Sequence, residues 1–362
     1  KEVTMEYNQR GHHLYQVLAM DAASGKLRTI VEERSDKFVN YARMWRQFVK
    51  DGKQLLWTSE RDNWNHLYLY DVEKGKVVRQ VTKGAWCLRE VQRVDEAKSV
   101  VYFSASGVHP QEDPYLIHYY KIGMDGKNMV ELTPGEGNHS AVFSYDYRYL
   151  VDTYSKVDQA PVTMLRDADT GKLLKTLESA DISRLQQHGW VAPEVFVAKG
   201  RDGKTDMWGV IYRPSNFDPS KKYPVIIDVY GEPAGSTVQD VWQGGDLWHQ
   251  YLANQGYIVV SIENRGAAAP RGREWRKCIY GEVGTFASQD QAQGILDLAR
   301  QYSFIDTSRI GITGWSGGGS QTLNCMFRYP DVFCTGIAIA FVSDQRLYDT
   351  IYQERYMHTP QA

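Results

Sequence analysis

Apolar and polar residues follow two different patterns along this chain, and the pattern changes near residue 190. Residues 1–190 consist of short apolar and aromatic runs interrupted by turn signals, as in LYQVLAMDAASGKLRTI and VTMLRDADTGKLLKTL. Each unit reads as a strand, an Asp-to-Gly turn, a lysine and a second strand, which is typical of a β-hairpin. The pattern therefore predicts an all-β region.

The glycines of these turns recur at a nearly constant spacing. Gly25, Gly75, Gly126 and Gly171 stand 50, 51 and 45 residues apart. A repeat of that length made of strands favours the blades of a β-propeller over a β-sandwich, which needs no fixed period. We predict that residues 1–190 form about four blades. Because the first unit starts in the middle of the pattern, we expect them to be the C-terminal part of a larger ring.

Residues 191–362 contain near-continuous apolar runs instead. KKYPVIIDVY, GYIVVSIEN, RIGITGW and CTGIAIAFV are typical of strands buried on both faces of a parallel sheet. DLWHQYLANQG and SQDQAQGILDLARQYSF lie between them and read as helices. The alternation predicts an open, doubly wound α/β sheet.

One serine in this second region stands among glycines. Residues 314–318, GWSGG, fit the G-x-S-x-G pattern of a nucleophile elbow, a sharp turn between a strand and a helix. The apolar run RIGITGW leads into it, and a segment that reads as a helix follows. Ser316 is thus the predicted nucleophile, and the N–H of Gly317 is a predicted oxyanion donor at a helix N-terminus. The alternative is a glycine-rich loop with an idle serine.

Tyrosines supply further candidates for the same site. Tyr230 follows the run VIIDV, at the strand edge where α/β sheets bind ligands, so its phenol is either an oxyanion donor or a packing residue. In RLYDTIYQERYM, Tyr348, Tyr352 and Tyr356 recur every four residues and would share one face of a helix. The residues alone leave open whether that face is core or the wall of a substrate pocket.

Composition narrows the possible partners. A net charge of −2 gives no reason to expect nucleic acid or an anionic membrane, and no apolar run reaches the ~18 residues of a membrane span. The four cysteines lack metal-ligand spacing; we expect free thiols, buried at Cys325 and Cys334, although the sequence leaves pairing open. Acyl transfer by serine needs no metal or organic cofactor, so none is expected.

Together these motifs resemble the prolyl oligopeptidase family of serine peptidases, in its dipeptidyl peptidase IV branch. WTSERDNWNHLYLYD and LTPGEGNHSAVFS are similar to propeller blades of that branch, and FDPSKKYPVIIDVYGEP and LYDTIYQERYM to its hydrolase domain. The resemblance implies an eight-bladed propeller, in part present here, followed by an α/β-hydrolase domain, incomplete in this chain. It leaves a homodimer open and favours a periplasmic or secreted location, although the residues themselves leave the compartment unknown.

The resemblance also implies an activity and a set of roles. The activity is removal of dipeptides from the N-termini of peptide substrates, after proline or a small residue. Ser316 matches the nucleophile, Gly317 and Tyr230 match the oxyanion donors, and Tyr348 and Tyr352 match the walls of the pocket for the proline ring.

Three departures from the family pattern affect these expectations. Gly317 stands where the family has Tyr or Phe, which removes one aromatic wall and weakens the expected preference for proline. The usual Gly-Gly-Pro after the oxyanion tyrosine is Gly-Glu-Pro here, so Glu232 places a charge near the site. The family's paired glutamates for the substrate amino group belong to an earlier blade, and Glu32 and Glu33 are interpreted as a solvated pair at a strand edge.

The acid and base that should activate Ser316 are not evident. The residues after it include Asp331, Asp344 and Asp349, and one histidine, His358. Asp331 follows the elbow helix too closely, and on one helix Asp349 and His358 would lie ~13 Å apart, because the rise is ~1.5 Å per residue. We therefore expect that this chain lacks the catalytic Asp and His, that it is an internal fragment of a longer enzyme, and that it is inactive or nearly so alone.

Two other functions stay open at this point. The space at Gly317 is compatible with a hydrolase of different specificity, acting on esters or longer peptides. A non-enzymatic binding protein is the second alternative, because propellers often bind partners and the triad is incomplete.

Overall fold

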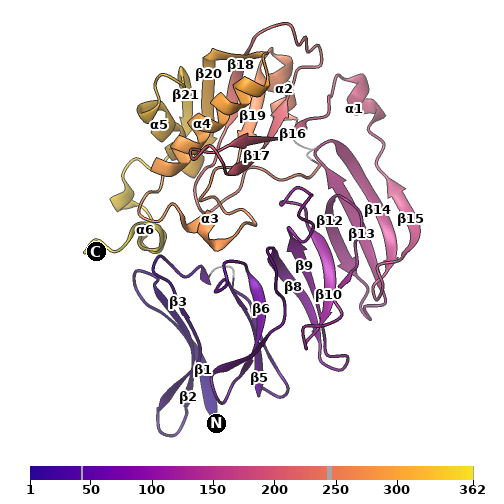
Figure 1. Ribbon diagram of the computed structural model, residues 1–362, viewed down its shortest axis with the longest axis vertical. Helices are drawn as coiled ribbons and strands as arrows, with labels where there is room; N and C mark the ends of the chain where they lie inside the picture. The colour runs from indigo at the N-terminus through magenta and orange to yellow at the C-terminus, as the bar shows by residue number, and fades with distance from the viewer. Residues whose placement is uncertain (42–43, 243–246, 362) are drawn as a thin grey trace.

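The computed structural model describes residues 1–41, 44–242 and 247–361. Four antiparallel sheets form the first half of the chain, and a six-stranded sheet with helices on both sides forms the second (Figure 1). In Figure 1 the four sheets fan out around one end of the α/β region, and helix α3 (Arg273–Lys277) lies between the two regions.

The four antiparallel sheets are built from strands that are neighbours in the chain. The first contains β1 (Glu2–Asn8), β2 (Leu14–Asp21) and β3 (Leu27–Arg34). The others have four strands each: β4 (Arg46–Val49), β5 (Gln54–Ser59), β6 (His66–Asp71) and β7 (Lys76–Gln80); β8 (Cys87–Asp95), β9 (Val100–Ser106), β10 (His118–Gly123) and β11 (Val130–Glu131); β12 (Asn138–Phe143), β13 (Tyr149–Lys156), β14 (Gln159–Asp167) and β15 (Leu173–Ser179). These sheets confirm the predicted propeller-like region of about four blades.

The repeating turn glycines join the last two strands of each blade. All four have positive φ, namely Gly25 at 71°, Gly75 at 60°, Gly126 at 80° and Gly171 at 73°. A Cβ at Gly75 would lie 2.5 Å from the carbonyl oxygen of Thr29, and one at Gly171 would lie 2.5 Å from that of Glu131. Each of these two turns therefore packs directly on the preceding blade, which explains why glycine recurs once per blade.

The six-stranded sheet has mixed pairing. Its order is β16 (Glu194–Lys199), β17 (Asp206–Tyr212), β19 (Ile258–Ile262), β18 (Tyr223–Asp228), β20 (Ile305–Trp315) and β21 (Thr335–Ile339). The last four strands run parallel, and β16 and β17 are antiparallel. The helices are α1 (Ser183–Gln187), α2 (Trp248–Asn254), α3, α4 (Thr285–Gln301), α5 (Gly317–Arg328) and α6 (Thr350–Met357).

Helices cover both faces of this sheet. Val260 packs in a core with Ile295 of α4, whereas the next residue back, Val259, packs with Ala253 of α2. Alternate residues of a strand point to opposite faces, so a strand covered on both faces needs apolar residues on both. The near-continuous apolar runs follow from this arrangement, and the doubly wound sheet is confirmed. The edge strand β21 departs from the prediction, because most of its residues are exposed and not buried. The boundary predicted at 190/191 stays a prediction.

Buried charges connect the two regions. Arg276 and Lys277 of α3 are almost fully buried and face Glu60, which follows β5 of the second blade. Arg276 forms an ion pair with Glu60, and the Lys277 ammonium lies 3.7 Å from the same carboxylate. Burial lowers the pKa of Lys277 to about 8. The two regions thus meet across a desolvated charge cluster and not only through apolar contact.

The structure corrects two expectations from the sequence. Glu33 is buried and accepts hydrogen bonds from Trp57 Nε1 at 2.9 Å and from the Arg61 guanidinium, so only Glu32 is exposed at the strand edge. All four cysteines are free as expected, but Cys334 is exposed and not buried.

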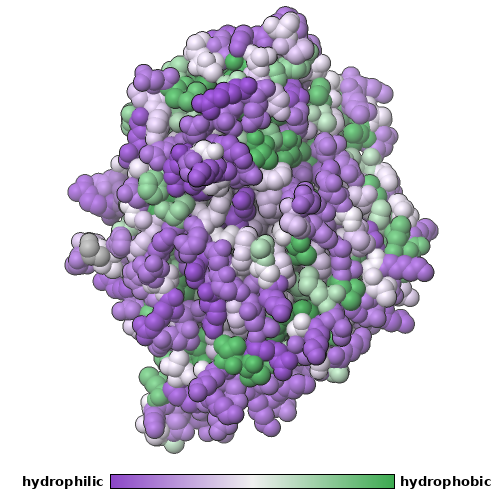
Figure 2. All heavy atoms as spheres, viewed as in Figure 1, coloured by the Kyte–Doolittle hydropathy of each residue, from purple (hydrophilic) through white to green (hydrophobic). Residues whose placement is uncertain are grey.

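The surface is largely polar. In the face shown in Figure 2, hydrophilic residues predominate and apolar residues gather in separate patches. Across the described residues, no helix is both long enough and apolar enough to cross a membrane.

Candidate active site

Ser316 stands at the junction between β20 and α5, with φ 57° and ψ −119°. An L-residue rarely adopts this conformation, which costs of the order of 1–3 kcal/mol. The Ser316 N–H donates to the carbonyl of Ile339 in β21 at 2.9 Å, and its carbonyl accepts from the N–H of Ser320 at 3.1 Å. The strained residue is therefore fixed between the neighbouring strand and the first turn of α5, in the geometry predicted for a nucleophile elbow.

The glycines around the serine are required by close backbone contacts. A Cβ at Gly314 would lie 2.4 Å from the carbonyl oxygen of Val229, and a Cβ at Gly318 would lie 2.1 Å from the same oxygen. Real Cβ atoms do not approach backbone oxygens that closely. The elbow thus rests on the end of β18, which places Ser316 next to the loop that follows β18.

That loop carries Tyr230, and the structure brings Tyr230 and Gly317 together. A Cβ at Gly317 would lie only 3.1 Å from Cζ of Tyr230. Burial raises the pKa of Tyr230, and the neighbouring Glu232 raises it further. The phenol is therefore protonated at neutral pH, as a hydrogen-bond donor to an oxyanion must be.

Two contacts hold the loop after β18 in place, one to its backbone and one to the ring of Tyr230. The buried Asn264 donates from Nδ2 to the carbonyl of Gly231 at 2.9 Å. Gly231 itself has φ 74°, a conformation that favours glycine. A Cβ at Gly235 would lie 2.7 Å from the Tyr230 ring, so the ring packs directly against that glycine. These contacts fix the direction of the phenol.

Glu232 occupies the space that the side chain after the nucleophile would otherwise fill. A Cβ at Gly317 would lie 2.8 Å from Oε2 of Glu232 and 2.9 Å from its carboxyl carbon. The carboxylate is buried, and the hydroxyl of Tyr352 donates to Oε2 at 2.6 Å. Burial raises the pKa of Glu232, and the hydrogen bond from Tyr352 opposes that rise.

Sequence reasoning noted the charge at residue 232 but missed that it fills this space. A signal was present: the chain departs from the family pattern twice, with a side chain lost at Gly317 and a longer one gained at Glu232. The two changes compensate each other in volume across a contact between different loops, which no spacing along the chain reveals.

The predicted tyrosine stripe is correct only in part. Helix α6 begins at Thr350, because Asp349 is its N-cap and accepts a hydrogen bond from the N–H of Tyr352 at 2.7 Å. Tyr348 precedes the helix in an extended conformation, so the three tyrosines do not share the face of one helix. The Tyr348 ring nevertheless meets the Tyr352 ring edge to face at 5.3 Å, and Tyr352 meets Tyr356 at 4.8 Å.

The three tyrosines have different environments. Tyr356 is buried and packs with Phe38 of the propeller region at 5.0 Å, which is a core role. Tyr352 is partly buried and reaches Glu232, and burial raises its pKa with Glu232 as the second cause. Tyr348 is 43% exposed. Tyr352 thus reaches the loop of Tyr230, and Tyr348 contacts the Tyr352 ring. That these two tyrosines form the walls of a substrate pocket stays a prediction.

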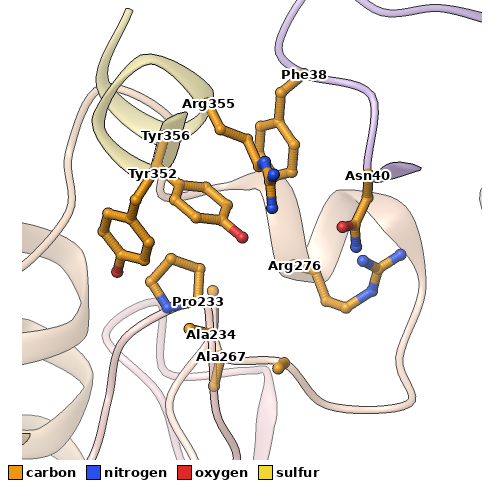
Figure 3. Close-up of a pocket in the computed structure, with 11 residues that line it drawn as sticks. Phe38, Asn40, Pro233, Ala234, Ala267, Arg276, Tyr352, Arg355 and Tyr356 are labelled. Atoms are coloured by element: carbon orange, nitrogen blue, oxygen red, sulfur yellow. The ribbon is translucent and has the colours of Figure 1, made fainter. Parts of the chain in front are cut away.

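A cavity of about 240 Å³ opens beside this site, between the two regions of the chain (Figure 3). Figure 3 shows Tyr352, Arg355 and Tyr356 of α6 on one side and Pro233 on another. It is lined by Phe38, Asn40, Pro233, Ala234, Gly266, Ala267, Ala268, Arg276, Tyr352, Arg355 and Tyr356. The α6 segment and the loop after β18 therefore contribute both to the elbow surroundings and to a cavity that the propeller region closes.

Three of the four residues considered for the acid and base have other partners. Asp344 forms an ion pair with Arg346 at 2.6 Å, and Asp349 caps α6. At the other end of α6, His358 Nδ1 lies 3.0 Å from the hydroxyl of Tyr280. Asp349 and His358 thus serve opposite ends of one helix, in keeping with their predicted separation. That the chain lacks the catalytic Asp and His stays a prediction.

The elbow serine on a doubly wound sheet, preceded by propeller blades, defines an α/β-hydrolase-fold protein with an N-terminal propeller. Residues 1–161 match the family model described as the dipeptidyl peptidase IV N-terminal region, and residues 246–362 match that of the prolyl oligopeptidase family. The chain belongs to the prolyl oligopeptidase family, in its dipeptidyl peptidase IV branch.

Individual relatives agree with this assignment. Dipeptidyl peptidase 4 of Trichophyton equinum and that of Trichophyton rubrum are each 32% identical over 309 residues, which is 83% of this chain and 39% of theirs. The crystal structure of Porphyromonas gingivalis dipeptidyl peptidase 4 superposes with a TM-score of 0.85 at 31% identity, covering 99% of this chain and 50% of that one. The chain thus spans about two fifths of the length of the curated relatives and half of the solved structure.

Proposed function

We propose that the protein to which this chain belongs is a serine exopeptidase that removes dipeptides from the N-termini of peptides. The observation that carries the proposal is Ser316, held in a strained conformation on the strand-to-helix turn, beside Tyr230 and Gly317. Strain of this kind is kept where the surrounding structure enforces it, and it clusters at active sites. The relatives named dipeptidyl peptidase 4 support the choice of substrate class.

The proposed mechanism assigns a role to each of these residues. Ser316 Oγ attacks the scissile carbonyl, and the bond to the amine breaks as an acyl-enzyme forms, which water then hydrolyses. The Gly317 N–H and the Tyr230 hydroxyl donate to the oxyanion of the tetrahedral intermediate, where one donor is worth ~10²–10³ in rate. Tyr230→Phe is expected to lower kcat by about that factor with little change in KM.

The base that accepts the Ser316 proton and the acid that orients the base are assigned to none of the residues in this chain. The polypeptide of residues 1–362 alone is therefore expected to be inactive or nearly so. An oxyanion hole without a working triad retains only ~10³–10⁴-fold catalysis over the reaction in water.

For specificity, we propose cleavage after proline or a small residue. Tyr348 and Tyr352 are proposed to form the walls of the pocket, and the Glu232 carboxylate takes the place of the missing aromatic wall at Gly317. Because Tyr352 donates to Glu232, Tyr352→Phe should leave a buried carboxylate without its donor and weaken binding at this pocket, which raises KM more than it lowers kcat.

A substrate panel with the native gene product tests the proposal. Chromogenic dipeptides with proline, alanine or phenylalanine next to the scissile bond are compared, each with a free and with an acylated amino terminus. The proposal predicts hydrolysis of the free proline and alanine substrates and loss of it on acylation. Hydrolysis of acylated peptides or simple esters at equal or higher rates would contradict it and favour a hydrolase of another specificity. Ser316→Ala is the control for background hydrolysis.

A further inference from the structure

The long connection between β9 and β10 in the third blade brings three metal-ligand side chains together. One ring nitrogen each of His109 and His118 and one carboxylate oxygen of Glu112 all lie within 4.8 Å of one another. His118 is the first residue of β10, and His109 and Glu112 lie in the connection before it. Two imidazoles and one carboxylate are a ligand set that zinc binds in proteins, with a fourth position left open to water.

Each histidine is oriented by a partner on one ring nitrogen. His118 Nδ1 lies 3.1 Å from the carbonyl of Thr133, which can only accept, so Nδ1 carries the proton and donates. The remaining nitrogen, Nε2, lies 2.9 Å from Oε2 of Glu112. His109 Nε2 lies 2.8 Å from Oε1 of Glu131. A metal-ligating histidine usually bonds through its second nitrogen to a carbonyl or a carboxylate in this way.

The second blade offers an internal comparison. His66 is the first residue of β6, as His118 is of β10, but its Nδ1 lies 3.1 Å from Thr82 Oγ1 and its Nε2 lies 2.9 Å from the carbonyl of Gly84. Both nitrogens of His66 therefore face neutral groups. The preceding connection there has six residues, 60–65, whereas the one before His118 has eleven, 107–117. The longer connection is what places His109 and Glu112 at His118.

The exposure of the three side chains is compatible with an ion bound near the surface. The His118 side chain is 2% exposed, that of Glu112 is 23% exposed and that of His109 is 39% exposed. The cluster thus has a buried wall at β10 and a solvent-accessible side on the connection. In a tetrahedral zinc site with bonds of ~2.0–2.1 Å the ligand atoms lie ~3.4 Å apart. Since the three ligand atoms here lie within 4.8 Å of one another, they need approach by at most about 1.4 Å.

We propose that His109, Glu112 and His118 bind a divalent transition-metal ion, Zn²⁺ in the first place, with Glu131 as the carboxylate that orients His109. The same connection carries Asp113 and Tyr115, which are buried and interact electrostatically with Arg271 of the α/β region. A bound ion would therefore fix the connection where the propeller meets the α/β region. This site is separate from Ser316, and its test does not depend on peptidase activity.

Isothermal titration of Zn²⁺ into the chelator-treated full chain tests the proposal. We expect one site that His109→Gln and Glu112→Gln each abolish or weaken at least tenfold, and that Glu131→Gln weakens by roughly 10–100-fold. Both replaced ligands are partly exposed, so the variants should fold. His66→Gln is the matched control, because it removes a histidine from the same place in the neighbouring blade, and it should bind Zn²⁺ as the parent does.

Two further measurements distinguish binding at this site from nonspecific binding. Ca²⁺, which prefers oxygen ligands, should not compete for the site. Co²⁺ at the same site should show the visible absorption of a four-coordinate complex, and His109→Gln should remove it. Absence of Zn²⁺ binding, or binding that survives both the His109 and the Glu112 substitutions, would overturn the proposal and leave the cluster as a set of histidine–carboxylate ion pairs.

Discussion

Replacing Gly317 by alanine probes the contact that distinguishes this site from its family pattern. The new Cβ would lie 2.8 Å from Oε2 of Glu232, a carboxylate that cannot turn away without losing the hydrogen bond from Tyr352 at 2.6 Å. Overpacking of this kind costs roughly 1–3 kcal/mol. In a Glu232→Ala background the Cβ loses its two closest contacts and keeps only the one at 3.1 Å to Cζ of Tyr230. The cost of Gly317→Ala should therefore fall by at least ~1 kcal/mol, a coupling energy of the size seen for residues in contact.

Urea unfolding of the full chain, followed by tryptophan fluorescence, measures the four members of this double-mutant cycle. Gly318→Ala is the matched control, because its Cβ would meet the backbone oxygen of Val229 at 2.1 Å, and its cost should be the same with Glu or Ala at 232. If Gly317→Ala costs the same in both backgrounds, within ~0.5 kcal/mol, the carboxylate does not fill the space beside the nucleophile and the reasoning is wrong.

Two further predictions concern buried charges outside the contact at Gly317. Burial raises the pKa of Glu263 from 4.5 to about 7. Because this folded-state pKa lies above the unfolded value, the folded protein is most stable when Glu263 is protonated. The full contribution of Glu263 to the free energy of unfolding is present below pH 4.5, and roughly 3 kcal/mol of it is lost as the pH rises through 7. Unfolding midpoints measured from pH 4 to 8 should show this loss, and Glu263→Gln should flatten it. Glu60→Ala leaves Arg276 buried and unpaired, which should destabilise the fold by roughly 3–5 kcal/mol. The same measurement should show little change for Arg346→Ala, because the ion pair of Arg346 with Asp344 is largely exposed. If Glu60→Ala and Arg346→Ala destabilise the protein equally, the proposed contribution of the buried charge cluster is wrong.

Much of the fold could be predicted from the sequence because the decisive signals are local. The four turn glycines have positive φ, and those at 75, 126 and 171 also rest on the preceding blade, so they mark one hairpin per blade. Strand segments covered on both faces must be apolar, so β18, β19 and the second half of β20 were evident as runs. The elbow was predicted because its serine and glycines are adjacent in the chain, although Gly314 and Gly318 are required in part by contacts with Val229 in the loop after β18.

The errors arose where a contact between distant segments decides the outcome. Glu33 is adjacent to a solvated glutamate in the chain, but Trp57 and Arg61 of the next blade bury it. Tyr348 is a different case, because a local contact decides it: the cap at Asp349 starts the helix after Tyr348, although the tyrosines fit a helical repeat. The pairing of Glu232 with Gly317 and the assembly of the histidine cluster join separate loops, and periodicity within a segment carries no information about either.

The most direct test of the account is labelling of the native gene product with a fluorophosphonate probe, with the modified residue identified by peptide mass spectrometry. The account predicts a label on Ser316 that is absent in Ser316→Ala and is prevented by a free-amino dipeptide with proline next to the scissile bond. A folded native product that leaves Ser316 unmodified would contradict the account, and the propeller would then be better explained as the binding surface of a protein without peptidase activity.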